Sequence, residues 1–261
     1  MALRIAFDLD GVLADMESEL VRQAGSIFGE AMTRKLQERA EERSPQPAPA
    51  PTATNNDGSE AIEGPQSATG DSLAGNTLPI VKLSMTSRQE RRLWRHVAEI
   101  ENFWESLKEI EHGVIGRLAS IAADRRWEII FLTKRPQTAG LTAQVQSQRW
   151  LESKGFALPS VYVVQGSRGR IAAALGLDIV IDDRPENCLD VVVDSKARAI
   201  LVWRQDEKAL PTAARRLGIG VVRSVSECLD ILTSVDSNPP EDSGVLDRVR
   251  RLLGLKEPAN V

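Results

Sequence analysis

Short apolar runs rich in β-branched residues recur along the second half of the chain, with segments of helical periodicity between them. Runs of this kind are typical of strands buried on both faces, as in a parallel sheet built from right-handed strand–helix–strand units. The five runs are EIIFLT (128–133), VYVV (161–164), DIVID (178–182), AILVW (199–203) and IGVV (219–222). RIAFDL, near the N-terminus, is a sixth. The pattern predicts an α/β fold, with a Rossmann-like parallel sheet flanked by helices.

A long insertion separates the first predicted strand from the other five. Helical patterns cover about 16–43 and 87–110, whereas residues 44–79 hold six of the 13 prolines, no aromatic residue and no periodicity. That composition predicts a disordered low-complexity segment. We therefore expect three parts, which are an α/β core (1–15 and 105–232), a helical cap inserted after the first strand (16–104), and a tail of linker and amphipathic helix (233–261).

The composition narrows the class of protein. A net charge of −4 and a pI near 5.5 argue against an extended surface for nucleic acid or anionic membrane. No window approaches the roughly 20 apolar residues of a transmembrane helix. Cys188 and Cys228 lack metal-site spacing and are too few for a disulfide framework. We expect a cytoplasmic protein without membrane association whose partner is a small molecule; the oligomeric state stays open.

Polar residues follow four of the predicted strands directly. Ligands of open parallel sheets bind outside the carboxyl ends of the strands, so these residues should meet at one edge. They are Asp8, Asp10 and Gly11; Thr133 and Lys134; Arg168 and Arg170; and Asp182 and Asp183. An Asp after a strand is commonly only a helix cap, but four such clusters in order favour a shared site. Oxygen ligands without His or Cys suit a hard cation, and Mg²⁺ in particular.

The order DLDGV, FLT, a basic segment and IDDRP resembles the motifs of the haloacid dehalogenase (HAD) superfamily of aspartate-nucleophile phosphohydrolases. DLDGVLAD together with IDDRPENC is most similar to the 5′(3′)-deoxyribonucleotidase-like branch. The resemblance covers roughly residues 1–15 and 105–232. It implies a Mg²⁺-dependent phosphatase that hydrolyses small phosphomonoesters, nucleotides above all, through an aspartyl-phosphate intermediate.

The first two motifs carry the covalent chemistry that the resemblance implies. Asp8 would be the nucleophile, and Asp10 would be the general acid and base whose backbone carbonyl also binds the metal. Thr133 would hydrogen-bond a phosphoryl oxygen, assisted by the backbone N–H of Lys134. Gly11 would let the chain turn sharply beneath the cap, next to the substrate.

The last two motifs would supply the remaining charges. Asp183 aligns with the metal-binding carboxylate of the family, and Asp182 would be a second acid that orients the site or a metal-bound water. The third motif departs from the family, which places a lysine there, whereas GSRGRIAAALG offers Arg168 or Arg170. We slightly favour Arg170, with Lys154 a distant third. An arginine could still clamp a phosphate.

The cap would close over the leaving group, where Trp94 and Trp104 are candidates to stack on a nucleobase. Aromatic residues at helical spacing are more commonly core residues. Two alternative functions stay open. The aspartyl-phosphate could be passed to an acceptor, as in a HAD-type phosphotransferase or mutase. Alternatively, the missing lysine and the low-complexity segment could indicate a catalytically impaired HAD-fold binding or regulatory module.

Overall fold

A computed structural model describes residues 3–43 and 83–237 of the chain. The low-complexity segment predicted over 44–79 and the amphipathic helix predicted within the tail lie outside these residues. Among the helices of the described ranges, none combines the length and the apolar character needed to cross a membrane.

Within the described ranges, six strands form one parallel sheet, in the order β3-β2-β1-β4-β5-β6. They are β1 (Arg4–Asp8), β2 (Glu128–Thr133), β3 (Ser160–Val163), β4 (Ile179–Asp182), β5 (Arg198–Val202) and β6 (Gly220–Val222). Each predicted apolar run forms one strand, and this confirms the predicted α/β class. The strand order reverses direction between β1 and β4, which is where ligands bind in open sheets of this kind.

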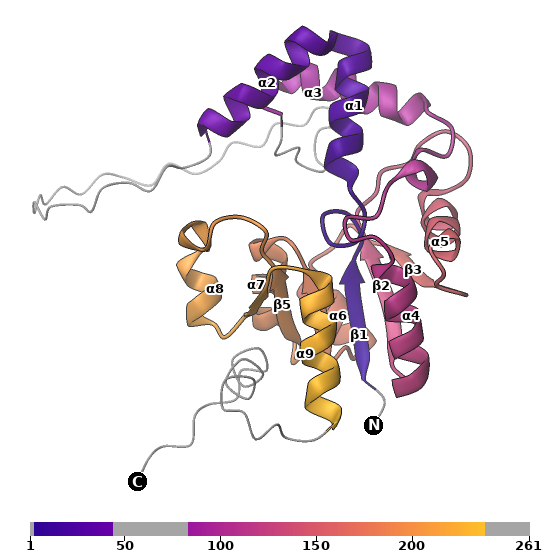
Figure 1. Ribbon diagram of the computed structural model, residues 1–261, viewed down its shortest axis with the longest axis vertical. Coiled ribbons are helices and arrows are strands. Elements are labelled where there is room, and N and C mark those ends of the chain that lie inside the picture. The colour runs from indigo at the N-terminus through magenta and orange to yellow at the C-terminus, as the bar shows by residue number, and fades with distance from the viewer. Residues whose placement is uncertain (1–2, 44–82, 238–261) are drawn as a thin grey trace, which may run out of the picture.

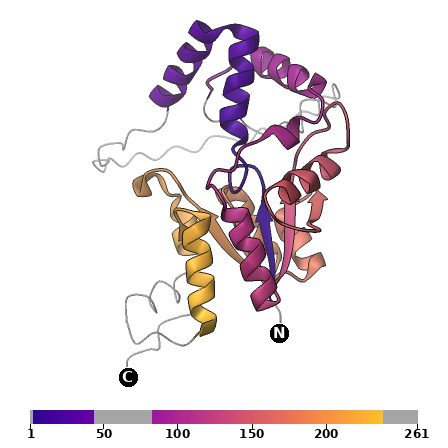
Figure 2. The ribbon, with the colours of Figure 1, turned by 45° about the vertical axis from the view of Figure 1, so that its right-hand side comes forward.

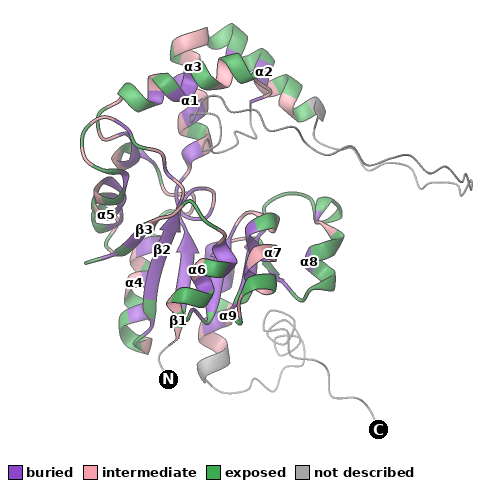
Figure 3. Ribbon diagram, turned by 180° about the vertical axis from the view of Figure 1, so that it is seen from behind, coloured by how far each residue is buried: buried purple, intermediate pink, exposed green. Residues whose placement is uncertain are grey.

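Helices cover both faces of the sheet (Figure 1). On one face lie α4 (Val114–Arg125), α5 (Ala143–Ser153) and α9 (Val225–Ser237). On the other lie α6 (Arg168–Leu175), α7 (Pro185–Asp194) and the short α8 (Thr212–Arg216). Helix α9 continues to Ser237, beyond the start of the tail expected at Thr233. Figure 3 shows the strands buried between these layers and α8 largely exposed.

The alternation of side chains along β1 explains why it lies at the centre of the sheet. Ile5 and Phe7 are fully buried in the core beneath α4, α5 and α9, whereas Ala6 belongs to the core beneath α6 and α7. Phe7 is in register with Phe131 of β2 and Ile181 of β4. Burial on both faces is the reason that this strand reads as a continuous apolar run.

The insertion after β1 forms a helical layer above the carboxyl ends of the strands (Figures 1 and 2). It contains α1 (Met16–Phe28), α2 (Glu30–Arg43) and α3 (Ser87–Glu99). The helical stretch predicted over 16–43 is therefore two helices, because the chain adopts a positive φ of 80° at Gly29. Leu93 and Val97 are fully buried on α3, as their spacing predicts.

Tight loops connect the two layers. After β1, the N–H groups of Leu13 and Ala14 both donate to the carbonyl of Leu9, at 2.9 and 2.7 Å. The N–H of Ile110 donates to Leu13 at 2.9 Å, so the chain returning from the cap runs beside the chain that leaves for it. These bonds fix the segment that follows Asp8, directly above the central strand.

Candidate active site

Asp8, at the end of β1, contacts a buried arginine. Nη2 of Arg168, the first residue of α6, donates to Oδ1 of Asp8, and Nε of Arg168 lies 3.5 Å from Oδ2 of Asp182. Arg168 is only 2% exposed. The side chain of Arg170, by contrast, is 85% exposed and faces Asp194 at 4.0 Å. Of the two arginines considered for the third motif, the structure therefore places Arg168 beside Asp8 and turns the favoured Arg170 away from it.

Close packing of α6 on α7 fixes the position of Arg168. A Cβ on Gly169 would lie 2.0 Å from the carbonyl oxygen of Asp190, so only glycine allows this approach. Arg168 is the first residue of α6, and its position around the helix axis directs its side chain toward Asp8 at the end of β1. Arg170 lies two residues further around the helix, and nearly 200° of rotation directs it to solvent.

Asp182, at the end of β4, is held by a full set of donors. Nδ2 of Asn187 donates to its two carboxylate oxygens at 3.0 and 2.9 Å, and the N–H of Arg184 donates to Oδ1 at 2.9 Å. Asp182 is 1% exposed. Burial raises its pKa, and the charge of Arg168 opposes that shift. These contacts place Asp182 beside Arg168 as a positioning group.

Asp10 is paired with Arg135, a residue for which the sequence predicted no role. Nε of Arg135 lies 3.1 and 3.0 Å from the two carboxylate oxygens of Asp10, and Nη2 donates to Oδ1 at 2.8 Å. The hydroxyl of Thr133 donates to Oδ2 at 3.1 Å. Thr133 thus positions Asp10 in this structure, and its contact with a phosphoryl oxygen stays a prediction.

Two tryptophans enclose the guanidinium of Arg135. Its Cζ lies 4.9 Å from the ring centroid of Trp104 and 5.6 Å from that of Trp150, within the range of cation–π attraction. Trp104 is fully buried in the short helix η1 (Phe103–Ser106), and its indole N–H donates to the carbonyl of Pro136 at 3.0 Å. Trp104 therefore supports Arg135 and is not exposed to a substrate.

Trp94 is also a core residue. It lies on α3, is 7% exposed, and belongs to the main hydrophobic cluster. The residues that line the cavity above Asp8 do not include it. The prediction that Trp94 and Trp104 stack on a nucleobase is thus wrong in this structure, because apolar burial of both rings outweighed their position in the insertion.

Asp183 differs from the other acids in that one of its oxygens has no partner. Oδ1 of Asp183 is buried and accepts no hydrogen bond from the described residues. Burial, and then the charge of Asp182, raises its pKa to about 7. Gly11, with φ of 87°, lies so close that an added Cβ would be 2.1 Å from Oδ2 of Asp183. Glycine is required there both by the backbone and by the adjacent carboxylate.

Arg168 has buried donors without an acceptor among the described residues, whereas Asp183 has a buried acceptor without a donor. Nη1 and Nε of Arg168 are buried and donate no hydrogen bond within the described residues. Burial raises the pKa of Asp8 well above its usual range; the charge of Arg168 opposes this, and the neighbouring acids add to it. A buried donor or acceptor without a partner costs on the order of 1–3 kcal/mol. The cavity is therefore lined by a residue with buried donors suited to an anion and by a residue with a buried acceptor suited to a cation.

These residues fit a Mg²⁺ ion with a phosphate better than a metal held by protein alone. Within residues 3–43 and 83–237, no group of three His, Cys, Asp or Glu side chains is arranged to hold a metal ion. Mg²⁺ commonly takes one or two carboxylates and fills its other positions with carbonyls, waters and phosphate oxygens. The unpartnered oxygen of Asp183, the carboxylate of Asp8 and the backbone carbonyl of Asp10 match that donor set.

A cavity of about 970 Å³ opens above these residues, large enough for a nucleotide-sized ligand. Its floor consists of Asp8, Asp10, Gly11, Lys134, Arg168 and Asp183. Its walls come from Gln37, Ala40 and Glu41 of α2 and from Trp203, Arg204 and Gln205 after β5. The half-buried Lys134 also lines the cavity, and its contact with a substrate stays a prediction.

Arg204 connects the segment after β5 to the loop after β1 and to Glu111. Its guanidinium donates to the carbonyls of Gly11 and Val12 and to Oε1 of Glu111, the last at 3.2 Å. Neither Arg204 nor Trp203 was predicted to belong to the site. Their position at the end of the apolar run AILVW (199–203) was the available signal, because the carboxyl end of every strand faces the same edge.

No family model and no curated protein matches the chain. Among solved structures, it is similar to a HAD family hydrolase from Deinococcus radiodurans with bound phosphate and sodium, at 15% identity and a TM-score of 0.48, with 92% of this chain and 98% of the other covered. A hydrolase from Pseudomonas syringae gives 17% identity and a TM-score of 0.46, with 91% and 100% covered. A phosphonoacetaldehyde hydrolase-like protein from Oleispira antarctica gives 15% and 0.45, with 98% and 96% covered. At these values the likeness says nothing about residue roles or substrate.

Proposed function

We propose that this protein is a HAD-type, Mg²⁺-dependent phosphatase of small phosphomonoesters. The observation that carries the proposal is a pair of buried atoms without a hydrogen-bond partner in the described ranges, Nη1 of Arg168 and Oδ1 of Asp183, in residues that line the same cavity as Asp8. A metal-bound phosphate would give both atoms a partner. The motifs DLDGV, FLT and IDDRP, which resemble those of the HAD superfamily, support the same reaction class.

In the first step, a carboxylate oxygen of Asp8 attacks phosphorus and the bond from phosphorus to the leaving oxygen breaks. Arg168, which already contacts Asp8, donates to the phosphoryl oxygens and offsets their charge. Asp10 gives a proton to the leaving oxygen. In the second step, water attacks the phosphorus of the aspartyl-phosphate, Asp10 accepts the proton of that water, and Asp8 is released with inorganic phosphate.

Bound Mg²⁺ would neutralise the phosphate and so permit the approach of a carboxylate nucleophile. Asp8 and Asp183 would hold it through their carboxylates, and Asp10 through its backbone carbonyl. Asp182 would act indirectly, because Asn187 and Arg184 already satisfy its oxygens. The role of Arg135 is to hold the Asp10 carboxylate in place through contacts with both of its oxygens.

We propose nucleotides as the favoured substrates. The cavity of about 970 Å³ exceeds what a phosphate and a short carbon chain would fill, and cap helix α2 forms a wall opposite the catalytic acids. Resemblance of DLDGVLAD and IDDRPENC to the 5′(3′)-deoxyribonucleotidase-like branch points the same way.

The test is phosphate release by the full chain from nucleoside monophosphates, sugar phosphates and an aryl phosphate, with Mg²⁺ and with EDTA. We expect release that EDTA abolishes and added Mg²⁺ restores, without any phosphoryl acceptor present. Release that persists undiminished in EDTA would contradict the metal-dependent mechanism. Release only after addition of an acceptor would indicate a phosphotransferase instead.

A further inference from the structure

One aromatic side chain lines the cavity above Asp8, and it comes from the core rather than the cap. Among the described residues that line this cavity, Trp203 is the sole Phe, Tyr or Trp. It follows β5 directly, and β5 is the neighbour of β4, the strand that ends at Asp182. Trp203 therefore lines the cavity one strand away from Asp182 and Asp183.

The indole of Trp203 is held in place before any ligand binds. Its Nε1 donates to the carbonyl of Asp206 at 3.0 Å, and its backbone N–H donates to the carbonyl of Val222 at 2.7 Å. Part of the ring packs against the hydrophobic cluster beneath α7, and the side chain is half-buried. A ring fixed in this way loses little conformational entropy when a second ring stacks on it.

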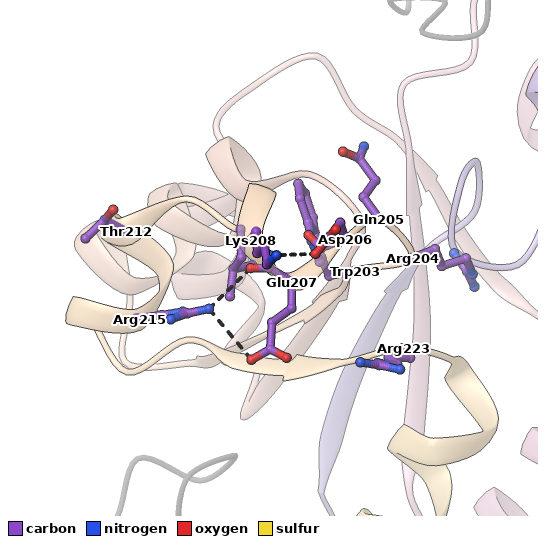
Figure 4. Close-up of a pocket in the computed structure, with 10 residues that line it drawn as sticks. Trp203, Arg204, Gln205, Asp206, Glu207, Lys208, Thr212, Arg215 and Arg223 are labelled. Atoms are coloured by element: carbon purple, nitrogen blue, oxygen red, sulfur yellow. Dashed lines mark hydrogen bonds and ion pairs between the residues drawn. The ribbon is translucent and has the colours of Figure 1, made fainter. Parts of the chain in front are cut away.

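A second cavity, of about 930 Å³, is lined by residues of the same segment (Figure 4). Trp203, Arg204 and Gln205 line both cavities. Lys208 and Arg223 line the second one, and no acid within the described residues forms an ion pair with either. The acids Asp206 and Glu207 line the same cavity, so a ring that rests on Trp203 would meet both donors and acceptors for the polar edge of a nucleobase.

We propose that Trp203 is the specificity-determining residue of the site, on which the nucleobase of a nucleotide substrate stacks while its phosphate lies at Asp8. This inference rests on the proposed phosphatase function. It adds the residue that would select the substrate by its leaving group. A planar heteroaromatic ring can stack on the rigid indole of Trp203, whereas a sugar phosphate has no ring that could stack on the face of the indole.

The experiment compares kcat/KM of the full chain for AMP, GMP, CMP and UMP with that for glycerol 3-phosphate, which has no ring. In Trp203→Leu, we expect the ratio of the nucleotide value to the glycerol 3-phosphate value to fall by about 5- to 150-fold, the effect of stacking one base on an aromatic side chain. Trp203→Phe should retain most of the ratio. Tyr162→Leu, which removes a 45% exposed aromatic outside both cavities, should retain all of it.

An equal loss on both kinds of substrate would overturn the inference, since it would mark a structural role, and so would an unchanged ratio in Trp203→Leu. If the unaltered protein released phosphate from none of these compounds, the proposed phosphatase would fail. Stacking is then measured by calorimetric binding of AMP to the unaltered protein and to Trp203→Leu. Weaker binding of the variant by the same factor supports the inference, and equal affinities or no binding to either protein refute it.

Discussion

Arg135 holds Asp10 from a position where its side chain has no exposed surface. The guanidinium bonds both carboxylate oxygens of Asp10 and also donates to the hydroxyl of Ser147 at 2.9 Å. A fixed fork of donors determines the direction in which the carboxylate points. The geometry of the proposed acid and base is thus set by a residue that need not touch the substrate.

Arg135→Lys should lower kcat by about 10- to 100-fold and leave KM within a few-fold. The charge persists, but the bidentate geometry that orients Asp10 is lost, and positioned acid–base catalysis is worth about 10²–10⁴ in rate. Steady-state kinetics across pH measure this effect, since a change in the pH profile of kcat marks Asp10. Arg149→Lys is the control, because Arg149 is half-exposed on α5 and faces Glu105 at 3.8 Å. A loss confined to KM would contradict the positioning role.

Arg168→Lys should retain measurable phosphatase activity, whereas Arg168→Met should lose at least about 10²–10³-fold in kcat/KM. Lysine keeps one charged donor beside Asp8, while methionine removes the positive charge that offsets the phosphoryl oxygens. Arg170→Met, on the exposed side of the same helix, is the matched control and should remain within about two-fold of the unaltered protein, as is usual for surface substitutions. Equal losses at the two positions would argue against the assignment of Arg168.

Asp183→Asn should raise the melting temperature in EDTA, and raise it more at pH 8 than at pH 5. Folding raises the pKa of Asp183 from 3.8 to about 7, so the cost of its buried charge is absent below about pH 4 and complete above about pH 7. Asparagine carries no such cost. Each kcal/mol gained corresponds to about 2–4 °C in a chain of this size. Thermal melts at the two pH values measure the gain.

The same variant should lose the stabilisation that Mg²⁺ gives the unaltered protein, because the ion binds only the folded state. An equal gain at both pH values would contradict the shifted pKa. Stabilisation by Mg²⁺ that survives the substitution would exclude Asp183 from the metal site.

Gly11→Ala and Gly29→Ala separate backbone strain from the contact with Asp183. Both glycines have positive φ, 87° and 80°, so both substitutions should cost about 1–3 kcal/mol of stability. A Cβ at Gly29 would meet nothing within 4 Å, but at Gly11 it would collide with the carboxylate of Asp183. Only Gly11→Ala should therefore lose Mg²⁺-dependent phosphate release. Comparable activity in the two variants would show that Asp183 moves aside without consequence.

The strands were predictable because a strand that is buried on both faces appears in the sequence as a continuous apolar run. Phe7, Phe131 and Ile181 lie side by side in register, and each sits within a continuous apolar run. The break between α1 and α2 at Gly29 was not expected, although the glycine was visible, because a glycine within a helical pattern is often tolerated.

Some residues of the site position other side chains and need not touch a ligand. Their roles could not be predicted from the residues next to them in the sequence. Arg135 follows Thr133 by two positions, and its partners Asp10, Trp104 and Trp150 come from distant segments. The choice between Arg168 and Arg170 depended on the phase of α6 against the sheet, which the approach of Gly169 to α7 decides. Neither packing relationship leaves a local pattern.

Nucleophilic attack by Asp8 is tested most directly by turnover of Asp8→Asn, with the best phosphomonoester and saturating Mg²⁺. Asparagine keeps the size of the side chain but removes the nucleophilic oxygen, so kcat should fall on the order of 10⁴-fold or more, as for other covalent nucleophiles. Acid quenching during turnover should yield a phosphoryl adduct on the peptide that contains Asp8, absent from the variant. A folded Asp8→Asn protein with activity within about ten-fold of the unaltered protein would contradict the aspartyl-phosphate mechanism.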